Sequence, residues 1–529
     1  MASDYMLWRL QFSFHCPRMM KYTPSQYLDV AAKLLAVSSA IYFFSFVTAD
    51  PDLWGHIKFG EDIWRAKGLV RTDPYSFTAY GQPWINHEWL AELIFFATYR
   101  YLGDSGLLFG KLGIGLFIVA VLCKICTFRK QLPLVYAAIM VLAISVISPG
   151  FMIRPQVFSF LFFTLFLYVL HLYFAQRKNL LFLLPCLMAL WVNLHGGFLM
   201  GWALLVIVVT WKTLAHFVFG RKNKDLGPLW LWFLVTSAAT LLNPYGYQLL
   251  VFLYKTLSLR RQISEWNRVP ILDMSYLNLK LLALLFLATL WVKPKQRQGW
   301  EVAGIAMTLI ASLRHERHMP FLGIMIAPYL VFRLSTLISE IQTRFPKLTL
   351  AKVSQNLVTI LLGIIVAYQA YNGIHRYAMA NCRIIVDPQT YPVAAVRFLK
   401  ANQIKGNLLL AFDWGEHAIW HLYPNCMVSI DGRFRTVYPE SVIQDHFIAD
   451  DNRARWRELI GKYPSDILLM PQIPFFQALI QPGSPWTYVY SDPIAIVFLR
   501  NSEKNTEALE RFKSGRFEYP KSPLSIYFP

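Results

Sequence analysis

Charged residues are scarce in this sequence. Asp, Glu, Lys and Arg make up 16% of its 529 residues, whereas soluble globular proteins average about 25%. Hydrophobic residues reach 56%. A chain with so few charges cannot cover all its apolar segments with a polar surface. The composition therefore argues against a soluble protein and predicts a membrane protein.

Cysteine is scarce as well, with six residues in the chain. Cys123 and Cys126 lie one helical turn apart in an apolar segment, which indicates packing within a helix bundle. Cys382 and Cys426 both fall in the C-terminal region, and the sequence leaves open whether they form a disulfide. So few, widely spaced cysteines exclude a fold held together by disulfides.

Several local signals are missing. The sequence shows no zinc-ligand spacing, no repeat of fixed period and no low-complexity tract. The stretch before Lys33 lacks the apolar core and small-residue cleavage site of a signal peptide. We therefore expect the first apolar run to stay as a membrane anchor. We also expect no cofactor, although His56, His87 and nearby carboxylates leave a divalent metal ion open.

The net charge of +20 raises the question of nucleic-acid binding. The basic residues, however, sit in short clusters between apolar runs, as Lys222 and Lys224 do. That placement is typical of cytoplasmic loops that anchor membrane helices. We expect contact with the lipid bilayer and no nucleic-acid partner.

Long apolar runs are abundant. A membrane helix needs roughly 17–25 predominantly apolar residues. About eleven segments are candidates, namely 30–48, 105–127, 133–149, 156–174, 180–194, 197–219, 228–242, 277–292, 300–313, 319–335 and 355–373. The segment from Trp89 to Leu102 is interrupted by Glu92 and Arg100, which favours an interfacial or re-entrant helix. The predicted fold class is a polytopic α-helical membrane protein.

The loops between these segments indicate the orientation. Alternate loops carry the basic clusters, as the positive-inside rule requires for a cytoplasmic N-terminus. Those clusters are Lys124/Arg129/Lys130, Arg177/Lys178, Arg221/Lys222/Lys224, Lys293/Lys295/Arg297 and Arg344/Lys347/Lys352, with Arg260/Arg261 as an exception. The first outer loop, 49–104, holds eight acidic and five basic residues. Residues 1–29 are therefore expected to be cytoplasmic, followed by a transmembrane part over 30–373.

The composition changes after residue 373. Strand-like runs at Asn407–Phe412, Met427–Ile430, Asp466–Met470 and Ile494–Leu499 alternate with helical stretches such as Val393–Ala401. Alternation of this kind predicts a small α/β domain over 374–529. An odd number of spans places that domain outside the cytoplasm.

Polar residues gather at the predicted outer side. Asp50 and Asp52 stand where the first span leaves the membrane, and Pro51 keeps that exit from continuing as regular helix. The other outer positions are His56, Asp73, His87, Glu88, Glu92, Arg154, His195, Asn243, Tyr245, Glu265 and the run from Arg314 to His318. An aspartate here can act as general base toward a hydroxyl group. Arginines can hold a phosphate by bidentate hydrogen bonds.

Each of these residues also has a structural interpretation. Asp50 and Asp52 could cap the helix that follows. Arg314 and Arg317 could extend to the interface beside Glu316. His195, beside two glycines, could be a turn residue, and Asp431-Gly432-Arg433 could form a tight turn.

The outer segments resemble a known class of membrane enzyme. The first outer loop carries Asp50-x-Asp52-x-Trp54-x-His56 and later His87-Glu88-Trp89. Further matching stretches are Arg154-Pro155-Gln156, Leu242-Asn243-Pro244-Tyr245-Gly246, Glu265-Trp266, Arg314-His315 and Asp431-Gly432-Arg433. Together they resemble the GT-C class of integral-membrane glycosyltransferases, and more narrowly a bacterial group of GT-C-like proteins with this first loop. The resemblance covers most of the chain, although each motif is short.

The resemblance implies an enzyme of the inner membrane of a bacterium. It implies transfer of a sugar from a polyprenyl-phosphate donor to an extracytoplasmic glycan, lipid or protein, with Asp52 or Asp50 as the base. Gly68, sixteen residues after Asp52, matches a class spacing and favours Asp52. Here Pro51 and Leu53 follow the two aspartates, where the commonest class pattern has glutamate. His56, Asp73, His87, Glu88, Arg154, Asn243, Tyr245, Glu265, Arg314 and Arg317 become candidate substrate-binding residues.

Two other functions remain as alternatives. A transporter or flippase for lipid-linked sugars would also place arginines near the interface. It would, however, show internal repeats and broken helices near the bilayer midplane, and we find neither. A non-catalytic envelope assembly protein would use the loop carboxylates only to hold the outer domain.

Overall fold

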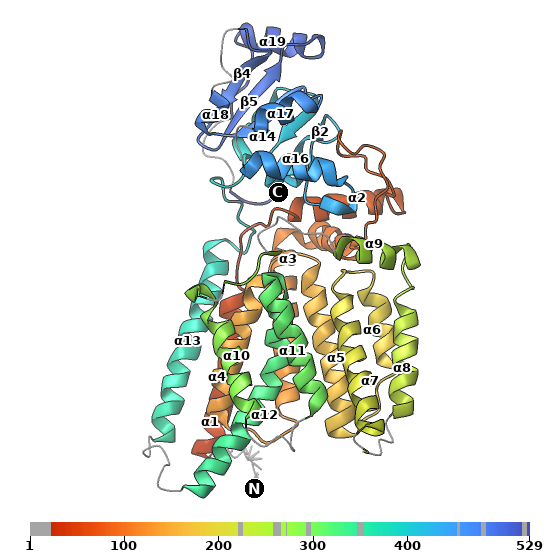
Figure 1. The fold of residues 1–529 in the computed structure, drawn as a ribbon. Helices are drawn as coiled ribbons and strands as arrows, with labels where there is room; N and C mark the ends of the chain where they lie inside the picture. Colours follow the sequence, from red (N-terminus) through yellow and green to blue (C-terminus); the bar gives the residue numbers. More distant parts are fainter. Residues whose placement is uncertain are drawn as a thin grey trace, which may run out of the picture.

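The chain folds into a bundle of helices with a smaller α/β domain at one end (Figure 1). The structure is a computed structural model. It describes residues 23–218, 220, 226–257, 266–270, 272–291, 298–345, 354–451, 455–477, 483–520 and 526–529. Most of the predicted cytoplasmic segment 1–29 lies outside the described residues, as do Glu265 and the Arg260/Arg261 pair.

Each segment predicted to span the membrane coincides with a helix. These helices are α1 (Pro24–Phe44), α3 (Trp89–Cys126), α4 (Pro133–Ile147), α5 (Gln156–Gln176), α6 (Leu183–Trp191), α7 (Phe198–Phe217), α8 (Leu226–Ala239), α10 (Leu277–Leu290), α11 (Gly299–Arg314), α12 (Met319–Arg344) and α13 (Gln355–Met379). Seven of the described helices are long and apolar enough to cross a membrane. The chain is thus a membrane protein. The count of eleven spans is not confirmed, because α6, α8, α10 and α11 are shorter.

The long helix α3 is bent at Gly103, whose φ of 67° lies in the left-handed region that glycine adopts most readily. This bend separates residues 89–102 from the apolar segment after it. The sequence predicted the same division, between an interfacial helix and a span.

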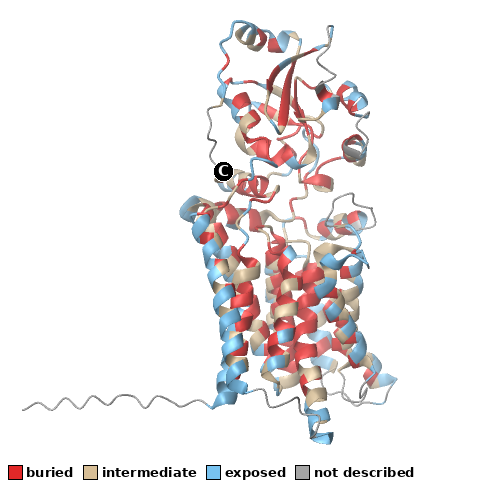
Figure 2. Cartoon of the chain, turned by 90° about the vertical axis from the view of Figure 1, so that its left-hand side faces the viewer, coloured by how far each residue is buried: buried red, intermediate tan, exposed pale blue. Residues whose placement is uncertain are grey.

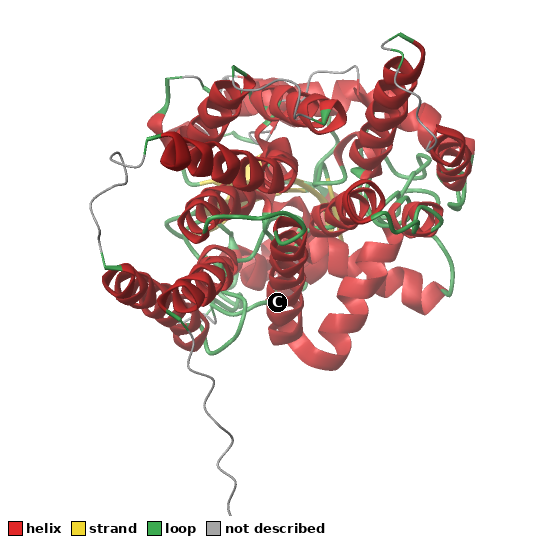
Figure 3. Cartoon of the chain, turned by 90° about the horizontal axis from the view of Figure 1, so that it is seen from below, coloured by secondary structure: helices red, strands yellow, loops and turns green. Residues whose placement is uncertain are grey.

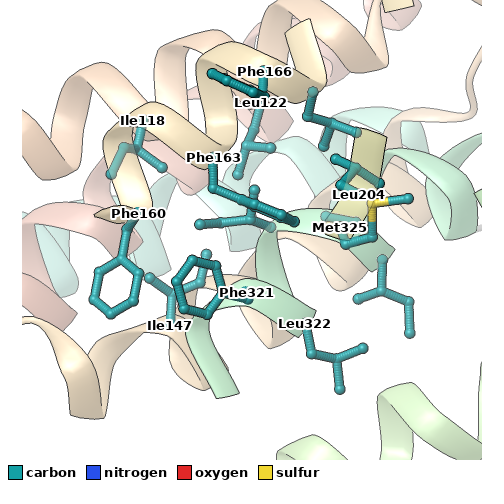
Figure 4. Close-up of a cluster of buried hydrophobic side chains, with 14 of the residues drawn as sticks. Ile118, Leu122, Ile147, Phe160, Phe163, Phe166, Leu204, Phe321, Leu322 and Met325 are labelled. Carbon is teal, nitrogen blue, oxygen red and sulfur yellow. The ribbon is translucent and has the colours of Figure 1, made fainter. Parts of the chain in front are cut away.

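Packing in the bundle centres on large apolar side chains. Buried residues run through the middle of the bundle and along the sheet of the domain (Figure 2). The Phe321 ring of α12 meets the rings of Phe160 and Phe163 of α5, with centroids 5.3 and 5.1 Å apart (Figure 4). Seen from the end opposite the domain, the helices are viewed end-on, with the strands behind them (Figure 3).

The first and last helices of the bundle, α1 and α13, pack along each other. The hydroxyl groups of Ser38 and Ser39 both donate to Gln369 Oε1, at 2.9 and 3.0 Å. Near the domain end of the bundle, Arg376 Nη1 donates to the carbonyl of Tyr42 at 2.8 Å. Lipid gives little hydrophobic drive for helices to associate, so such polar contacts and close packing hold them together.

Replacing Gly373 by alanine is expected to destabilise the bundle by about 1–3 kcal/mol, because an added methyl group overpacks a close helix contact. A Cβ there would stand 2.7 Å from Ile41 Cγ2 and 2.9 Å from the Ile41 carbonyl oxygen. Gly363 on the same helix is a matched control, because a Cβ there meets no described atom within 4 Å. Gly363→Ala should be neutral or slightly stabilising. Thermal unfolding in detergent compares the two, and equal midpoints would contradict the close packing.

The C-terminal domain contains a five-stranded sheet in the order β2-β1-β3-β5-β4. Its strands are β1 (Gly406–Leu410), β2 (Cys426–Val428), β3 (Ile467–Pro471), β4 (Trp486–Ser491) and β5 (Ala495–Arg500). Strands β2, β1 and β3 run parallel, with Leu408 opposite Val428 and Ile467, and β5 and β4 continue antiparallel. This confirms a small sheet domain at the C-terminal end. Cys382 and Cys426 are free thiols.

Helices cover this sheet. They are α14 (Val393–Ala401), α15 (Gly415–Leu422), α16 (Glu440–Asp451), α17 (Trp456–Lys462), α18 (Pro474–Gln477) and α19 (Thr506–Lys513). The bounds of α14 are those that the sequence predicted.

The loop between α1 and α3 joins the domain to the bundle. We call residues 45–88 the first loop; it contains α2 (Leu53–Ala66), which lies across the end of the bundle beneath the domain (Figure 1). Helix α9 (Tyr247–Leu257) lies at the same level. Isolated β-bridges join Thr48 to Ile385 and Ser76 to Val428. The first loop is therefore placed against both the bundle and the domain.

Candidate functional site

Asp50, Asp52 and Arg154 meet where α1 leads into the first loop. Arg154 Nε lies 2.6 Å from Asp50 Oδ1, and its Nη2 lies 3.2 Å from Asp52 Oδ2. Arg154 comes from the turn before α5, so two segments about a hundred residues apart form one ion-paired group. The sequence placed these residues on one face, and the structure brings them into contact.

The two aspartates differ in exposure. The side chain of Asp50 is 6% exposed, and its Oδ1 also accepts a hydrogen bond from the Asp52 backbone N–H at 3.1 Å. The side chain of Asp52 is 27% exposed. Asp52 stands at the N-cap of α2, but its side chain makes no capping hydrogen bond. Asp50 is thus held in place, whereas Asp52 is the more accessible carboxylate.

A third carboxyl group comes from the C-terminal domain. Glu416, on α15, is 3% exposed, and its Oε2 accepts from the backbone N–H of Gly55 at 3.1 Å. Its other oxygen faces Gly432, which also borders Asp52 Oδ1. Burial raises the pKa of Glu416 well above its ordinary value, and the charge of Asp52 raises it further. Glu416 therefore holds its proton more tightly than an ordinary glutamic acid does.

Two glycines make room for this carboxyl group. A Cβ at position 55 would overlap Glu416 Oε2. At position 432 it would overlap Asp52 Oδ1 and stand 2.6 Å from Glu416 Oε1. The site is thus built from the first loop and the domain together.

Replacing Glu416 by glutamine should make stability less dependent on pH. The folded protein holds the Glu416 proton more tightly than the unfolded chain does. Stability of the wild type therefore falls as pH rises from 4.5, the ordinary pKa, toward the raised one. Glutamine cannot ionise, so the variant lacks this pH-dependent contribution to stability. We expect the thermal midpoint of Glu416→Gln to rise relative to that of the wild type as pH rises from 5 to 8. A difference between the two midpoints that stays constant over this range would contradict the raised pKa of Glu416.

A second polar group surrounds Glu88, at the end of the first loop. Glu88 Oε1 lies 3.7 Å from His87 Nε2 and 3.6 Å from His195 Nε2. Burial favours the neutral acid, but the neighbouring His87, His56 and Arg317 outweigh it and lower the pKa of Glu88. Glu88 therefore stays ionised among imidazole rings.

His56 connects the two groups. It projects from α2, and its Nδ1 lies 3.8 Å from Glu92 Oε1. Burial opposes a charge on the ring, but Glu92, Glu88 and Asp52 outweigh it and raise the pKa of His56 above 6.5. The His56 imidazole thus interacts electrostatically with both the Asp52 carboxylate and Glu88.

His195 is fixed by its neighbours. Trp191 Nε1 donates to Ser159 Oγ at 2.8 Å, and this hydroxyl lies 2.7 Å from His195 Nδ1. The Gly197 N–H also donates to Nδ1 at 3.0 Å. Nδ1 is thus an acceptor, which assigns the proton to Nε2, on the side of Glu88. Burial lowers the pKa of His195 to about 3, so the ring is neutral.

Arg317 reaches the same region from the turn between α11 and α12. Its Nη2 donates to Gln156 Oε1 at 3.0 Å, and its guanidinium lies 4.6 Å from the Trp266 ring centroid. Gln156 follows Arg154 by two residues, so Arg317 and Arg154 flank one turn. Arg314, at the end of α11, is exposed.

Asp73 takes part in a different network. Its Oδ1 lies 2.7 Å from Arg433 Nη1, and Asp431 Oδ2 lies 2.6 Å from Arg433 Nη2. The Tyr438 hydroxyl also donates to Asp431 at 2.5 Å. Both carboxylates are fully buried. Asp73 and the Asp431-Gly432-Arg433 turn therefore lock the first loop to the domain.

Asn243 and Tyr245 stabilise backbone turns. Asn243 Oδ1 accepts from the Tyr245 N–H at 2.9 Å, and the Tyr245 hydroxyl accepts from the Asn86 N–H at 3.0 Å. Together they support the end of the first loop next to His87. Glu265 lies outside the described residues.

The residue that sequence reasoning missed is Glu416. Glu416 comes directly after Trp414-Gly415, a pair that follows a strand-like run and that a tight turn would also explain. Glu92 was named among the outer residues but given no role. Among the described residues, no three His, Cys, Asp or Glu side chains are grouped so as to hold a metal ion.

Comparison with known proteins finds no matching family model. No curated protein matches either. Solved structures do match. The archaeal oligosaccharyltransferase AglB from Archaeoglobus fulgidus, in complex with an inhibitory peptide and a dolichol-phosphate, aligns with a TM-score of 0.57 and 11% identity, over 84% of this chain and 69% of that one.

Two further structures extend the comparison. The Archaeoglobus fulgidus oligosaccharyltransferase tethered with an acceptor peptide aligns with a TM-score of 0.55 and 12% identity, over 85% of this chain and 69% of that one. ArnT from Cupriavidus metallidurans bound to undecaprenyl phosphate aligns with a TM-score of 0.48 and 12% identity, over 90% of this chain and 98% of that one. The two archaeal matches show that the chain shares the fold of these oligosaccharyltransferases. The finer resemblance, to the group with the Asp-x-Asp-x-Trp-x-His loop, stays a prediction.

Proposed function

We propose that this chain is a membrane glycosyltransferase that moves a sugar from a polyprenyl-phosphate donor to an acceptor outside the cytoplasm. The accessible carboxylate of Asp52 beside Arg154 carries the proposal, since it pairs a base with a cation for phosphate. The GT-C fold supports it. AglB, which shares that fold, was solved with a dolichol-phosphate, a lipid phosphate of the proposed donor's kind.

The proposed reaction is a displacement at the sugar's anomeric carbon. Asp52 accepts the proton of an acceptor hydroxyl as its oxygen bonds to that carbon. The bond from the carbon to the phosphate oxygen breaks, and its electron pair leaves with the polyprenyl phosphate. Arg154 neutralises the charge that develops there. Asp50 holds Arg154 in position at 2.6 Å.

The remaining candidates take supporting roles. Arg317, and Arg314 at the exposed end of α11, would bind the donor phosphate. His56, His87 and Glu88 would contact the sugar or the acceptor between the two polar groups. Asp73, Asn243 and Tyr245 would shape the site through the first loop.

The proposed location is the inner membrane of a bacterium, with the N-terminus cytoplasmic and the C-terminal domain outside. The basic clusters between the predicted spans support this orientation. Helix α2, which Asp50 and Asp52 precede, lies at the end of the bundle that carries the domain (Figure 1), so the site would face the extracytoplasmic side.

Transfer in proteoliposomes tests the proposal. Purified protein would be given a panel of polyprenyl-phosphate sugars with crude envelope as acceptor, and both sugar incorporation and free polyprenyl phosphate would be measured. We expect one donor to be consumed by the wild type and not by the Asp50→Asn/Asp52→Asn double variant. Equal turnover by both proteins would refute the assignment. Donor movement across the bilayer without turnover would favour a transporter. Reduced abundance of the variant without loss of specific activity would favour an assembly protein.

A further inference from the structure

A cavity of about 210 Å³ lies in the C-terminal domain, between α14 and α15. Val396 contributes to its apolar wall. Its polar lining comes from Arg397 and Lys400 of α14, from His417 and His421 of α15 and from Tyr527, and Pro529 completes the wall. We call it the α14–α15 cavity. It is separate from the candidate site already described, although His417 directly follows Glu416.

The charge in this cavity is positive. Arg397 and Lys400 are three residues apart, on one face of α14, and both are exposed. Burial lowers the pKa of His421 to about 4, and Lys400 and Arg397 lower it further. Burial also lowers the pKa of His417, as do His421 and Arg397. The described charged groups that act on the two rings are thus themselves basic.

One polar ring atom of the cavity wall has no hydrogen-bond partner among the described residues. His417 is 2% exposed, and its Nδ1 is buried without a hydrogen-bond partner among the described residues. Leaving a buried polar atom unpaired is unfavourable, so such atoms usually have a hydrogen-bond partner. A ligand oxygen in the cavity can accept a hydrogen bond from this ring when its proton is on Nδ1.

The chemistry favours an anion over a metal ion. His417 and His421 stand four residues apart, with ring centroids 4.7 Å from each other, a spacing that also suits metal ligands. The adjacent guanidinium and ammonium groups would repel a cation and attract an oxyanion. Arginine and lysine side chains are common partners of phosphate and carboxylate groups.

We propose that the α14–α15 cavity binds an oxyanion group, a phosphate or a carboxylate, between Arg397, Lys400 and the His417 ring. The bound group would lie close to the first loop, because the Trp54 ring packs 4.9 Å from the His417 ring. Trp54 follows Asp52 by two residues. The proposal concerns binding and does not depend on the proposed reaction.

Binding of ³²P-labelled inorganic phosphate to the full chain in phosphatidylcholine nanodiscs tests this site by equilibrium dialysis. Arg397→Gln/Lys400→Gln should weaken binding at least about tenfold, because it removes two charged hydrogen-bond donors from the cavity. Lys405→Gln/Lys513→Gln removes the same charge from two exposed positions of the same domain and should leave affinity within about twofold. Absence of saturable binding by the wild type, or equal losses in both variants, would overturn the proposal.

Two further arms identify the source of the group. Sodium acetate in place of unlabelled phosphate as competitor shows whether a carboxylate occupies the same site. Nanodiscs that contain phosphatidic acid show whether a lipid headgroup does. If the labelled phosphate binds more weakly in those nanodiscs, and the Arg397→Gln/Lys400→Gln change removes this effect of the lipid, the site is assigned to a lipid phosphate. Unchanged binding assigns it to a water-soluble oxyanion.

Discussion

Replacement of Asp52 by asparagine should lower the rate of sugar transfer by about 10²–10⁴-fold, the usual contribution of a general base. Asparagine keeps the shape of the side chain but cannot accept the acceptor's proton. The carboxylate is partly exposed and makes no capping bond to α2, so its loss should leave the fold intact. Initial rates at saturating donor, with thermal unfolding of the same preparations, measure both effects.

Asp50→Asn is the matched variant. Asp50 is buried against Arg154 Nε, and its Oδ1 also accepts from the Asp52 N–H. Its replacement should loosen Arg154, raise the KM for the donor and lower kcat less than Asp52→Asn does. The reverse ranking would transfer the role of base to Asp50. Normal rates in both single variants would remove the aspartates from the reaction.

Replacement of Arg433 by methionine should destabilise the protein by about 3–5 kcal/mol, because it leaves two buried carboxylates without their cation. The guanidinium pairs with Asp73 of the first loop and Asp431 of the domain. It also lies 4.9 Å from the Tyr75 ring centroid and 5.0 Å from that of Trp84. We expect a lower thermal midpoint and faster proteolysis of the first loop.

Arg455→Met is the control for this prediction. Arg455 pairs with Glu458 at 2.7 Å, but the two side chains are 52% and 67% exposed. Exposed ion pairs typically contribute about 0–1 kcal/mol, so the midpoint should hardly move. Adding Asp73→Asn and Asp431→Asn to Arg433→Met should recover part of the loss, since it removes the unpaired charges. Equal effects of Arg433→Met and Arg455→Met would show that the network does not hold the domain.

The sequence predicted those features that depend on local pattern. Apolar runs located the helices of the bundle, and strand-like runs alternating with a helical stretch located four of the strands and α14. Charge between the runs placed Asp50, Asp52 and Arg154 on one face, and the structure joins them. The bend at Gly103 falls between residues that the pattern had already divided.

The rest of the site depends on contacts between distant segments. Glu416 accepts a hydrogen bond from the Gly55 N–H, which lies 361 positions away in the sequence. Hydrophobic periodicity describes local structure and cannot predict such a contact. Asp73 was expected to bind substrate, but its carboxylate is occupied by Arg433. The Asn243 side chain stabilises a local turn by accepting a hydrogen bond from the Tyr245 N–H. A lone polar residue looks the same in sequence whether it meets a substrate, another domain or its own backbone.

The pairing of α1 with α13 also sets an order of events during synthesis. The hydroxyl groups of Ser38 and Ser39 find Gln369 only after some 330 further residues have been made. The bridge from Thr48 to Ile385 forms later still. Asp52 therefore emerges from the ribosome long before Glu416 and Gly432, its neighbours from the domain. A chain that stops before α13 would insert its first helices and yet leave the bundle open and the site unassembled.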